Sequence, residues 1–192
     1  MHHDADRRTL IQFSLLAGLA GLLPPARAGE ATAATGTATP QDFDFLVGTW
    51  RIAHRKLKDR LVGSQEWLEF EGSCHMHKLL DGLANVDDNL FEVPGVPYRG
   101  VTLRAYDAQT RNWRIWWLDS RFPQKIDVPV VGGFADGVGT FLSDDEWKGT
   151  PVKVRFRWSH ITPTSARWEQ AFSTDDGKSW EINWSMRFTR TA

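Results

Sequence analysis

The sequence predicts an all-β fold, an antiparallel up-and-down β-barrel of about ten strands. Two observations support this prediction. Apolar and polar residues alternate along run after run, and Gly, Pro or Asp residues separate the runs. No segment has the periodicity of an amphipathic helix, apart from one short helical turn expected at 42–46. Because closure of such a sheet removes its exposed edge strands, we expect a barrel.

The expected strands follow one another through the chain with short turns between them. Alternation is clearest at 152–158, where apolar residues at even positions alternate with basic residues at odd positions. In 180–188, Trp180, Ile182 and Trp184 are expected to share a face with Met186 and Phe188. The expected strands are 51–58, 65–78, 83–93, 98–107, 113–120, 125–134, 138–147, 152–161, 166–174 and 179–190.

The N-terminal residues 1–28 are expected to form an export signal peptide. A twin-arginine-like pair, Arg7 and Arg8, precedes an apolar run at 10–23 and a small-x-small cleavage site at 26–28. An ordinary secretory signal is the alternative. Residues 29–41 are small and polar, and we expect a disordered linker there, followed by a single barrel domain at 42–192. The expected location is periplasmic or secreted, with no stable membrane span after signal cleavage.

Composition narrows the class of partner. The chain has 192 residues and a formal net charge of -1, so a nucleic-acid partner is not expected. Cys74 is the single cysteine, which excludes an internal disulfide. The 10 Trp residues are unusual for this length and suit a core, a cavity or an interface. Oligomeric state is left open.

A segment near the C-terminus, "FSTDDGKSWEINW" at 172–184, resembles the Asp-box of sialidase-type propeller blades. A propeller repeats its motif in several blades, whereas this chain has one copy and no repeat of blade length. The segment is therefore expected to be a hairpin turn between two strands, in which Gly177 supplies a positive φ.

A second motif, "FDFLVGTWRI" at 43–52, resembles the start of lipocalin or calycin-type barrels. The resemblance implies that Gly48 and Trp50 close the barrel floor under a basic residue of the last strand, Arg187 or Arg190. With ten strands, the chain is similar to nitrobindin-like and fatty-acid-binding-type barrels. It also resembles the DUF1579-like family of exported bacterial proteins of unknown function, which combine this start with a late "DGGKSW"-like hairpin.

Nitrobindin-like proteins hold haem, but their glycine pattern is absent here. That pattern needs Gly at the positions of Ile52 and His54. His160 lies broadly where an axial ligand would fall in such a protein. We expect no cofactor, with haem or a single metal ion as the alternative. His75 and His77 share a strand face and are the weak candidates for metal ligands, although a solvated pair is expected.

An aromatic stripe favours a small-molecule site, because a ten-stranded barrel is wide enough to leave an interior cavity. The expected partner is a small hydrophobic or aromatic molecule. The alternative is that the tryptophans only pack the core. Arg104 and Gln170 are expected to provide polar contacts to the ligand. The expected wall consists of Trp113, Trp117, Trp158, Trp168 and Trp184.

Whether the chain is an enzyme is left open. His54 and His160 are expected to point inward from their strands, and Asp119 follows Trp117 on the same face. An inward His could serve as the general base of a lyase or isomerase. Residues Asn85, Asp87 and Asn89 also share a face, which is expected to be solvated rather than a Ca or Mg site.

Overall fold

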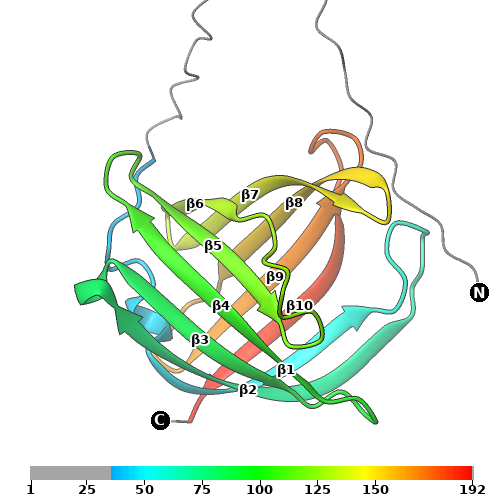
Figure 1. Cartoon of the computed structure of the whole chain (residues 1–192), viewed down its shortest axis with the longest axis horizontal. Coiled ribbons are helices and arrows are strands. Elements are labelled where there is room, and N and C mark those ends of the chain that lie inside the picture. Colours follow the sequence, from blue (N-terminus) through cyan, green and yellow to red (C-terminus); the bar gives the residue numbers. More distant parts are fainter. Residues whose placement is uncertain (1–35, 192) are drawn as a thin grey trace, which may run out of the picture. The chain divides into compact units, whose positions relative to one another are not determined.

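The computed structural model describes residues 36–191, so the expected signal peptide and residues 29–35 of the expected linker lie outside the described part. Ten strands form a closed antiparallel barrel in which β1 pairs with both β2 and β10 (Figure 1). The predicted fold class is confirmed. The strands are β1 (Gly48–Leu57), β2 (Trp67–Leu79), β3 (Ala84–Phe91), β4 (Tyr98–Asp107), β5 (Asn112–Asp119), β6 (Val130–Ala135), β7 (Val138–Trp147), β8 (Thr150–Ser159), β9 (Ser165–Ser173) and β10 (Glu181–Arg190).

Helical structure in the described chain is confined to two short 3-10 turns, η1 (Asp44–Leu46) and η2 (Leu80–Gly82). The first lies within the helical turn expected at 42–46. Residues 36–41, in the stretch expected to be a linker, lie against the turn between β4 and β5. There the Gly36 N–H donates to the Thr110 carbonyl at 2.7 Å, and Ala38 is buried. Across 36–191, no helix has the length and apolar character needed to cross a membrane.

The pairing of β5 with β6 is short. It joins residues 113–115 to residues 130–132, whereas every residue of β5 pairs with β4. The strand expected at 125–134 therefore begins only at Val130. Residues 120–129 instead form a loop, with an isolated bridge between Leu118 and Ile126 and a hydrogen bond from the Ser120 N–H to the Arg99 carbonyl at 3.0 Å. Pro123 and Pro129 explain the correction, because proline has no N–H to donate to a strand ladder.

A β-bulge changes the faces of β10. The register against β9 shifts between Ile182 and Trp184, so Asn183 is an extra residue. Asn183 is buried and accepts a hydrogen bond from the Gln170 amide at 2.8 Å, whereas Ile182 is exposed. The expected common face for Ile182 and Trp184 is wrong, since one inserted residue reverses the alternation.

The Asp-box-like segment is a hairpin loop between β9 and β10. The Ser173 hydroxyl accepts a hydrogen bond from the Gly177 N–H at 2.8 Å, and the Asp175 carboxylate accepts one from the Ser179 N–H at 2.8 Å. Gly177 has a φ of 85°, in the region that favours glycine. These bonds join residues of the loop to one another and to the last residue of β9, as expected for a turn.

One end of the barrel is closed by Trp50. Its side chain is fully buried, and its indole N–H donates to the Leu46 carbonyl at 2.8 Å. The Arg190 guanidinium lies 4.1 Å from the Trp50 ring centroid. It also donates to the Val47 and Phe45 carbonyls, each at 2.5 Å, and so ties the last strand to the segment before β1.

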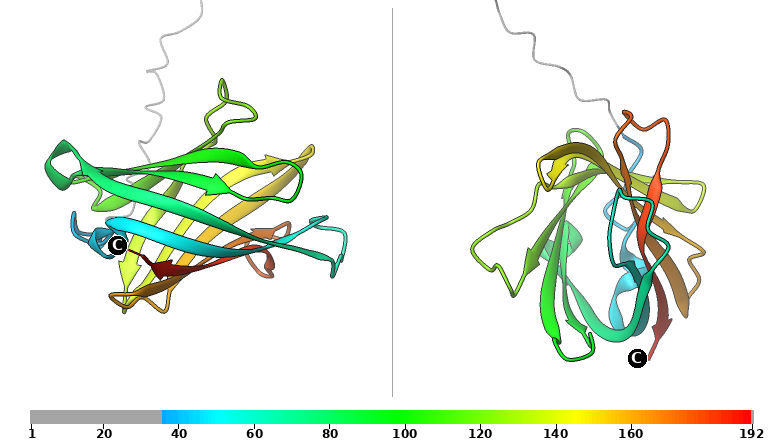
Figure 2. Two further views of the ribbon diagram at one scale, coloured as in Figure 1. Left: turned by 90° about the horizontal axis from the view of Figure 1, so that it is seen from below. Right: turned by 90° about the vertical axis from the view of Figure 1, so that its right-hand side faces the viewer.

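The basic residue over Trp50 is therefore Arg190, and the expectation of Arg187 is wrong. Trp50 and Arg190 are direct partners in the register of β1 with β10. Arg187 is three residues away, an odd number, so it points to the opposite face and is exposed. The ten strands wrap around a common interior (Figure 2).

Candidate functional site

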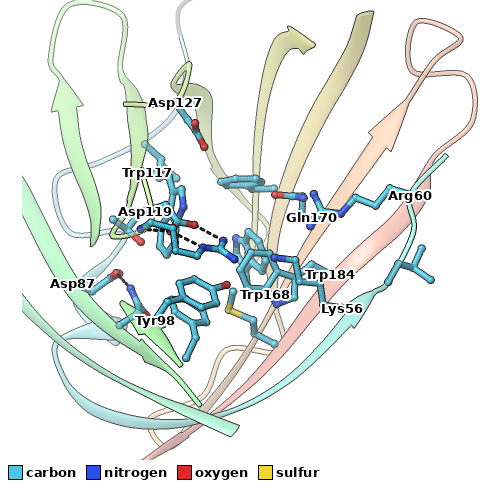
Figure 3. A pocket seen from close by; sticks show the side chains of 18 of the residues that line it. Lys56, Arg60, Asp87, Tyr98, Trp117, Asp119, Asp127, Trp168, Gln170 and Trp184 are labelled. Carbon is cyan, nitrogen blue, oxygen red and sulfur yellow. Dashed lines mark hydrogen bonds and ion pairs between the residues drawn. The ribbon is translucent and has the colours of Figure 1, made fainter. Parts of the chain in front are cut away.

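The barrel interior contains a cavity of about 460 Å³. Its lining comes from β1, β3, β4, β5 and the strands β7 to β10, together with loops 58–66 and 120–129 (Figure 3). These two loops lie at the end of the barrel opposite Trp50, because β1 starts at Trp50's end and finishes at loop 58–66. The cavity therefore extends from the interior toward the end that Trp50 does not close.

Aromatic side chains form much of the cavity wall. Trp168 and Trp184 meet edge to face, with ring centroids 5.6 Å apart, and Phe156 packs on Trp168 at 4.9 Å. Trp117 contacts Phe91 on the other side of the cavity at 5.6 Å. The structure places all of the expected ligand-contacting residues in the lining except Trp113. Those in place are Trp117, Trp158, Trp168, Trp184, Arg104 and Gln170.

Trp113 lies at the closed end instead of in the cavity. Its ring is fully buried edge-on against Phe43, with centroids 5.1 Å apart, and its indole N–H donates to the Thr39 carbonyl at 3.0 Å. Trp113 and Trp117 do share a face of β5, but Trp113 is four residues nearer the closed end. The expectation failed because alternation gives the face of a strand and not the depth along the barrel axis.

A buried polar network lies deep in the cavity wall. The Arg104 guanidinium forms an ion pair with Asp87 at 2.6 Å and donates to the Asn85 amide oxygen at 3.0 Å. The Asn89 amide donates to Asp87 at 2.5 Å. The expected solvated face of β3 is therefore buried. The reason is that Phe91 continues the same alternating face, and its ring packs inside the barrel.

Lys56 is a cavity residue that the sequence analysis missed. Its ammonium lies 3.9 Å from the centroid of the Trp184 ring. Burial, together with the charges of Arg60 and Arg121, lowers the pKa of Lys56 to about 7, although the charge of Asp119 opposes this shift. Its place in the alternating pattern could have predicted this position, because Lys56 lies on the same inward face of β1 as Trp50.

Asp119 and Arg121 form a charged pair at the same end of the cavity. Three hydrogen bonds join them, from the Arg121 backbone N–H at 2.9 Å, from its Nε at 2.9 Å and from its Nη2 at 2.5 Å. Burial alone would raise the pKa of Asp119, but these bonds outweigh it and hold that pKa below its usual range. Arg121 also lies 3.8 Å over the Tyr98 ring, and burial raises the pKa of Tyr98 to about 12. Asp119 thus lines the cavity as expected, but as a paired carboxylate.

Arg60 completes a group of basic side chains at this end. Its guanidinium lies 4.6 Å from the Trp147 ring and 5.3 Å from the Phe172 ring. Burial lowers the pKa of Arg60 to about 10. Glu181 is close enough to oppose that shift, but both of its carboxylate oxygens accept hydrogen bonds from the Leu61 N–H. Arg60 is therefore held by aromatic contacts.

His54 is buried behind the cavity wall and is not part of the lining. It accepts a hydrogen bond from the Trp184 indole N–H at 3.3 Å and stacks on Phe70, with ring centroids 4.6 Å apart. Burial and, to a smaller extent, the Lys56 charge lower the pKa of His54 to about 3. A Cβ at Gly72 would lie 2.7 Å from its Nε2, so the ring is tightly enclosed. His54 is a neutral ring that positions Trp184.

His160 is exposed, so its expected inward orientation is wrong. It follows the last residue of β8, and its φ of 52° interrupts the alternation that placed it with Trp158. Its Nδ1 is 3.0 Å from the Ser159 hydroxyl. The side chain considered for an axial haem ligand therefore does not face the cavity, and the residues present do not fit a haem held through it.

His75 and His77 are exposed on the outer face of β2, as expected. Their ring centroids are 6.0 Å apart, and His75 Nδ1 is 3.0 Å from the Thr49 hydroxyl. Within residues 36–191, no group of three or more His, Cys, Asp or Glu side chains is arranged to hold a metal ion. Burial raises the pKa of the Cys74 thiol above its usual range.

The fold and its cavity define this molecule as a closed β-barrel with an aromatic interior site. No family model matches the sequence, and no curated protein has a significant match to it. Among solved structures, the S-type phycobiliprotein lyase CPES from Guillardia theta is similar, with 12% identity, a TM-score of 0.49 and coverage of 78% of this chain and 90% of that chain. A redesigned beta barrel has 10% identity, a TM-score of 0.45 and coverage of 82% and 99%, respectively.

Proposed function

We propose that this chain binds a small hydrophobic or aromatic molecule in the barrel cavity. The observation that carries the proposal is a cavity of about 460 Å³ with indole and phenyl rings along its wall. Sites for small molecules are commonly concave, largely apolar and a few hundred Å³ in volume, with few polar groups. Here the polar part of the lining consists of Gln170, Thr102, Asn89 and eight charged side chains.

The wall is suited to a flat ring. Trp168 and Trp184 meet at 88°, so their faces and edges form a corner into which a planar molecule can pack. His54 holds the Trp184 indole from behind, which limits the movement of this part of the wall. A wall that is already ordered before binding loses less side-chain entropy when the ligand arrives.

A fluorescence titration with the uncharged probe phenylnaphthylamine tests this proposal. We expect saturable binding with quenching of tryptophan emission. The Thr102→Trp variant places an indole in the cavity and should lower affinity at least about tenfold. Thr140→Trp adds the same ring on the exposed face of β7 and should leave affinity unchanged. Equal affinity for all three proteins, with folding confirmed by circular dichroism, would contradict an interior site.

A general base for an enzymatic reaction was the alternative role considered for the histidines. Neither His54 nor His160 contributes to the cavity lining. No observation on these two residues favours a second function, and binding is the function proposed.

A further inference from the structure

The cavity lining carries an excess of positive charge. It contains five basic residues and three acidic ones, Asp87, Asp119 and Asp127, so 5 − 3 gives a formal excess of two positive charges. Two of the basic residues are neutralised inside the cavity, Arg104 by Asp87 and Arg121 by Asp119.

The remaining basic residues of the lining have different surroundings. Lys58 pairs with the exposed Glu66 at 3.0 Å, outside the cavity. Lys56 and Arg60 have no carboxylate within ion-pair distance among residues 36–191. Asp127 is not their counter-ion, since Figure 3 shows it on the loop side of the cavity, away from Lys56.

Both unpaired cations are held on aromatic faces. Lys56 lies over Trp184 and Arg60 lies over Trp147. A cation–π contact fixes the position of a charged group but uses no strong hydrogen-bond acceptor. The ammonium and guanidinium N–H groups therefore remain available to a ligand. Burial is the largest cause of the lowered pKa of Lys56, and the charge of Arg60 contributes to the same shift, as expected for two cations that repel each other.

We propose that the cavity ligand is an aromatic carboxylate, whose ring packs on Trp184 and Trp168 and whose carboxylate binds Lys56 and Arg60. This inference rests on the proposed binding function and names the ligand class. A carboxylate supplies the acceptors that both cations lack, and hydrogen bonds between charged partners are stronger than neutral ones. It also relieves the repulsion between two cations whose charges act on each other in a partly desolvated site.

Three probes with one ring system test the inference: naphthoate, the neutral naphthamide and the cationic naphthylmethylamine. Each is measured by displacement of phenylnaphthylamine from the wild-type protein. We expect naphthoate to bind about ten- to a hundredfold more tightly than naphthamide, which is the range for hydrogen bonds to charged groups. The amine should bind most weakly. This comparison needs no variant.

Substitutions then assign the effect to the two cations. Lys56→Met and Arg60→Met should each lower naphthoate affinity about tenfold and leave naphthamide affinity within about twofold. Arg55→Met removes the same charge from the outward face of β1, where Arg55 contacts Trp67 and Glu69, and should change neither affinity.

The outcomes separate the two proposals. If phenylnaphthylamine and naphthamide bind but naphthoate has no advantage, the carboxylate inference is overturned and the proposed function stands. If Arg55→Met lowers naphthoate affinity as much as Lys56→Met, the preference reflects overall charge and the assigned site is wrong. If none of the aromatic probes binds, both proposals are overturned.

Discussion

The Lys56 ammonium lies 3.9 Å from the centroid of the Trp184 ring, and the Trp184 indole N–H in turn donates to His54. The Trp184 indole thus contacts a charged group on its cavity side and a buried imidazole on its core side. Lys56 and His54 belong to β1, and Trp184 belongs to β10, the strand with which β1 pairs. Substitution of any of these three residues should therefore change both the ligand affinity and the free energy of unfolding.

Carboxylate affinity should fall as pH rises above about 7. The pKa of Lys56 is lowered to about 7 in the free protein. A bound carboxylate raises that pKa, so binding above about pH 7 takes up a proton and weakens by up to about tenfold per pH unit. Of the groups around it, Arg60, Arg121 and Asp119 keep their charge in this range, and Tyr98 titrates near 12.

Naphthoate titrations between about pH 6 and about pH 9 measure this dependence. Lys56→Arg keeps the charge across the range and should abolish the decline. Naphthamide binding should be independent of pH in both proteins. A decline that persists in Lys56→Arg would show that another group takes up the proton.

His54 should make stability depend on pH. Its pKa is lowered to about 3 by burial, so between about 3 and about 6.5 the unfolded chain binds a proton that the folded chain does not. As the pH is lowered through this window, the free energy of unfolding therefore decreases, by up to roughly 1 kcal/mol per pH unit from this group. His54→Phe, which can keep the stacking on Phe70, should remove that part of the slope.

Urea denaturation at several pH values measures the His54 contribution as the difference in slope between the variant and the wild-type protein. Carboxylates contribute equally to both proteins and cancel in the difference. His160→Gln is the matched control, because His160 is exposed. Identical slopes for wild type and His54→Phe would mean that the histidine is protonated in the folded barrel.

Arg190→Met should lower the free energy of unfolding by about 2–3 kcal/mol. The substitution removes the cation over Trp50 and the donors to the Val47 and Phe45 carbonyls. Arg187→Met changes the same residue type on the exposed face of the same strand and should cost less than about 0.5 kcal/mol. Equal urea midpoints for the two variants would refute the role of Arg190 in closing the barrel.

Gly100→Ala should disturb the cavity wall, because a Cβ at Gly100 would lie 2.1 Å from Cη2 of Trp117. The ring has to move, which should cost about 1–3 kcal/mol and lower phenylnaphthylamine affinity. Trp117→Leu shortens the side chain that clashes. The double variant Gly100→Ala/Trp117→Leu should therefore be more stable than the sum of the single effects predicts. Strict additivity in urea denaturation would contradict the close packing of these two residues.

Alternation was sufficient to predict the barrel and most of its aromatic wall. Trp158 and Trp168 occupy regular strands in which every second residue points inward, and they lie where the pattern placed them. The pattern failed where the backbone departs from regular β geometry. His160 has a positive φ at a strand end, and Ile182 precedes a bulge, and neither feature leaves a periodic signal in the sequence.

The charged part of the site was harder to predict for a different reason. Lysine and arginine are usually exposed, so Lys56 and Arg60 carry no sequence mark of burial. Arg60 belongs to a loop whose path depends on the completed barrel, and Arg121 belongs to the irregular loop 120–129. Only the closed structure brings these residues to one end of the cavity.

A crystal structure of the protein with bound naphthoate is the decisive test of the proposed binding site. We expect the naphthalene ring inside the barrel against Trp184 and Trp168, with the carboxylate within hydrogen-bond distance of Lys56 and Arg60. Naphthoate bound on the outside of the barrel, with the aromatic rings closed over the interior, would contradict it.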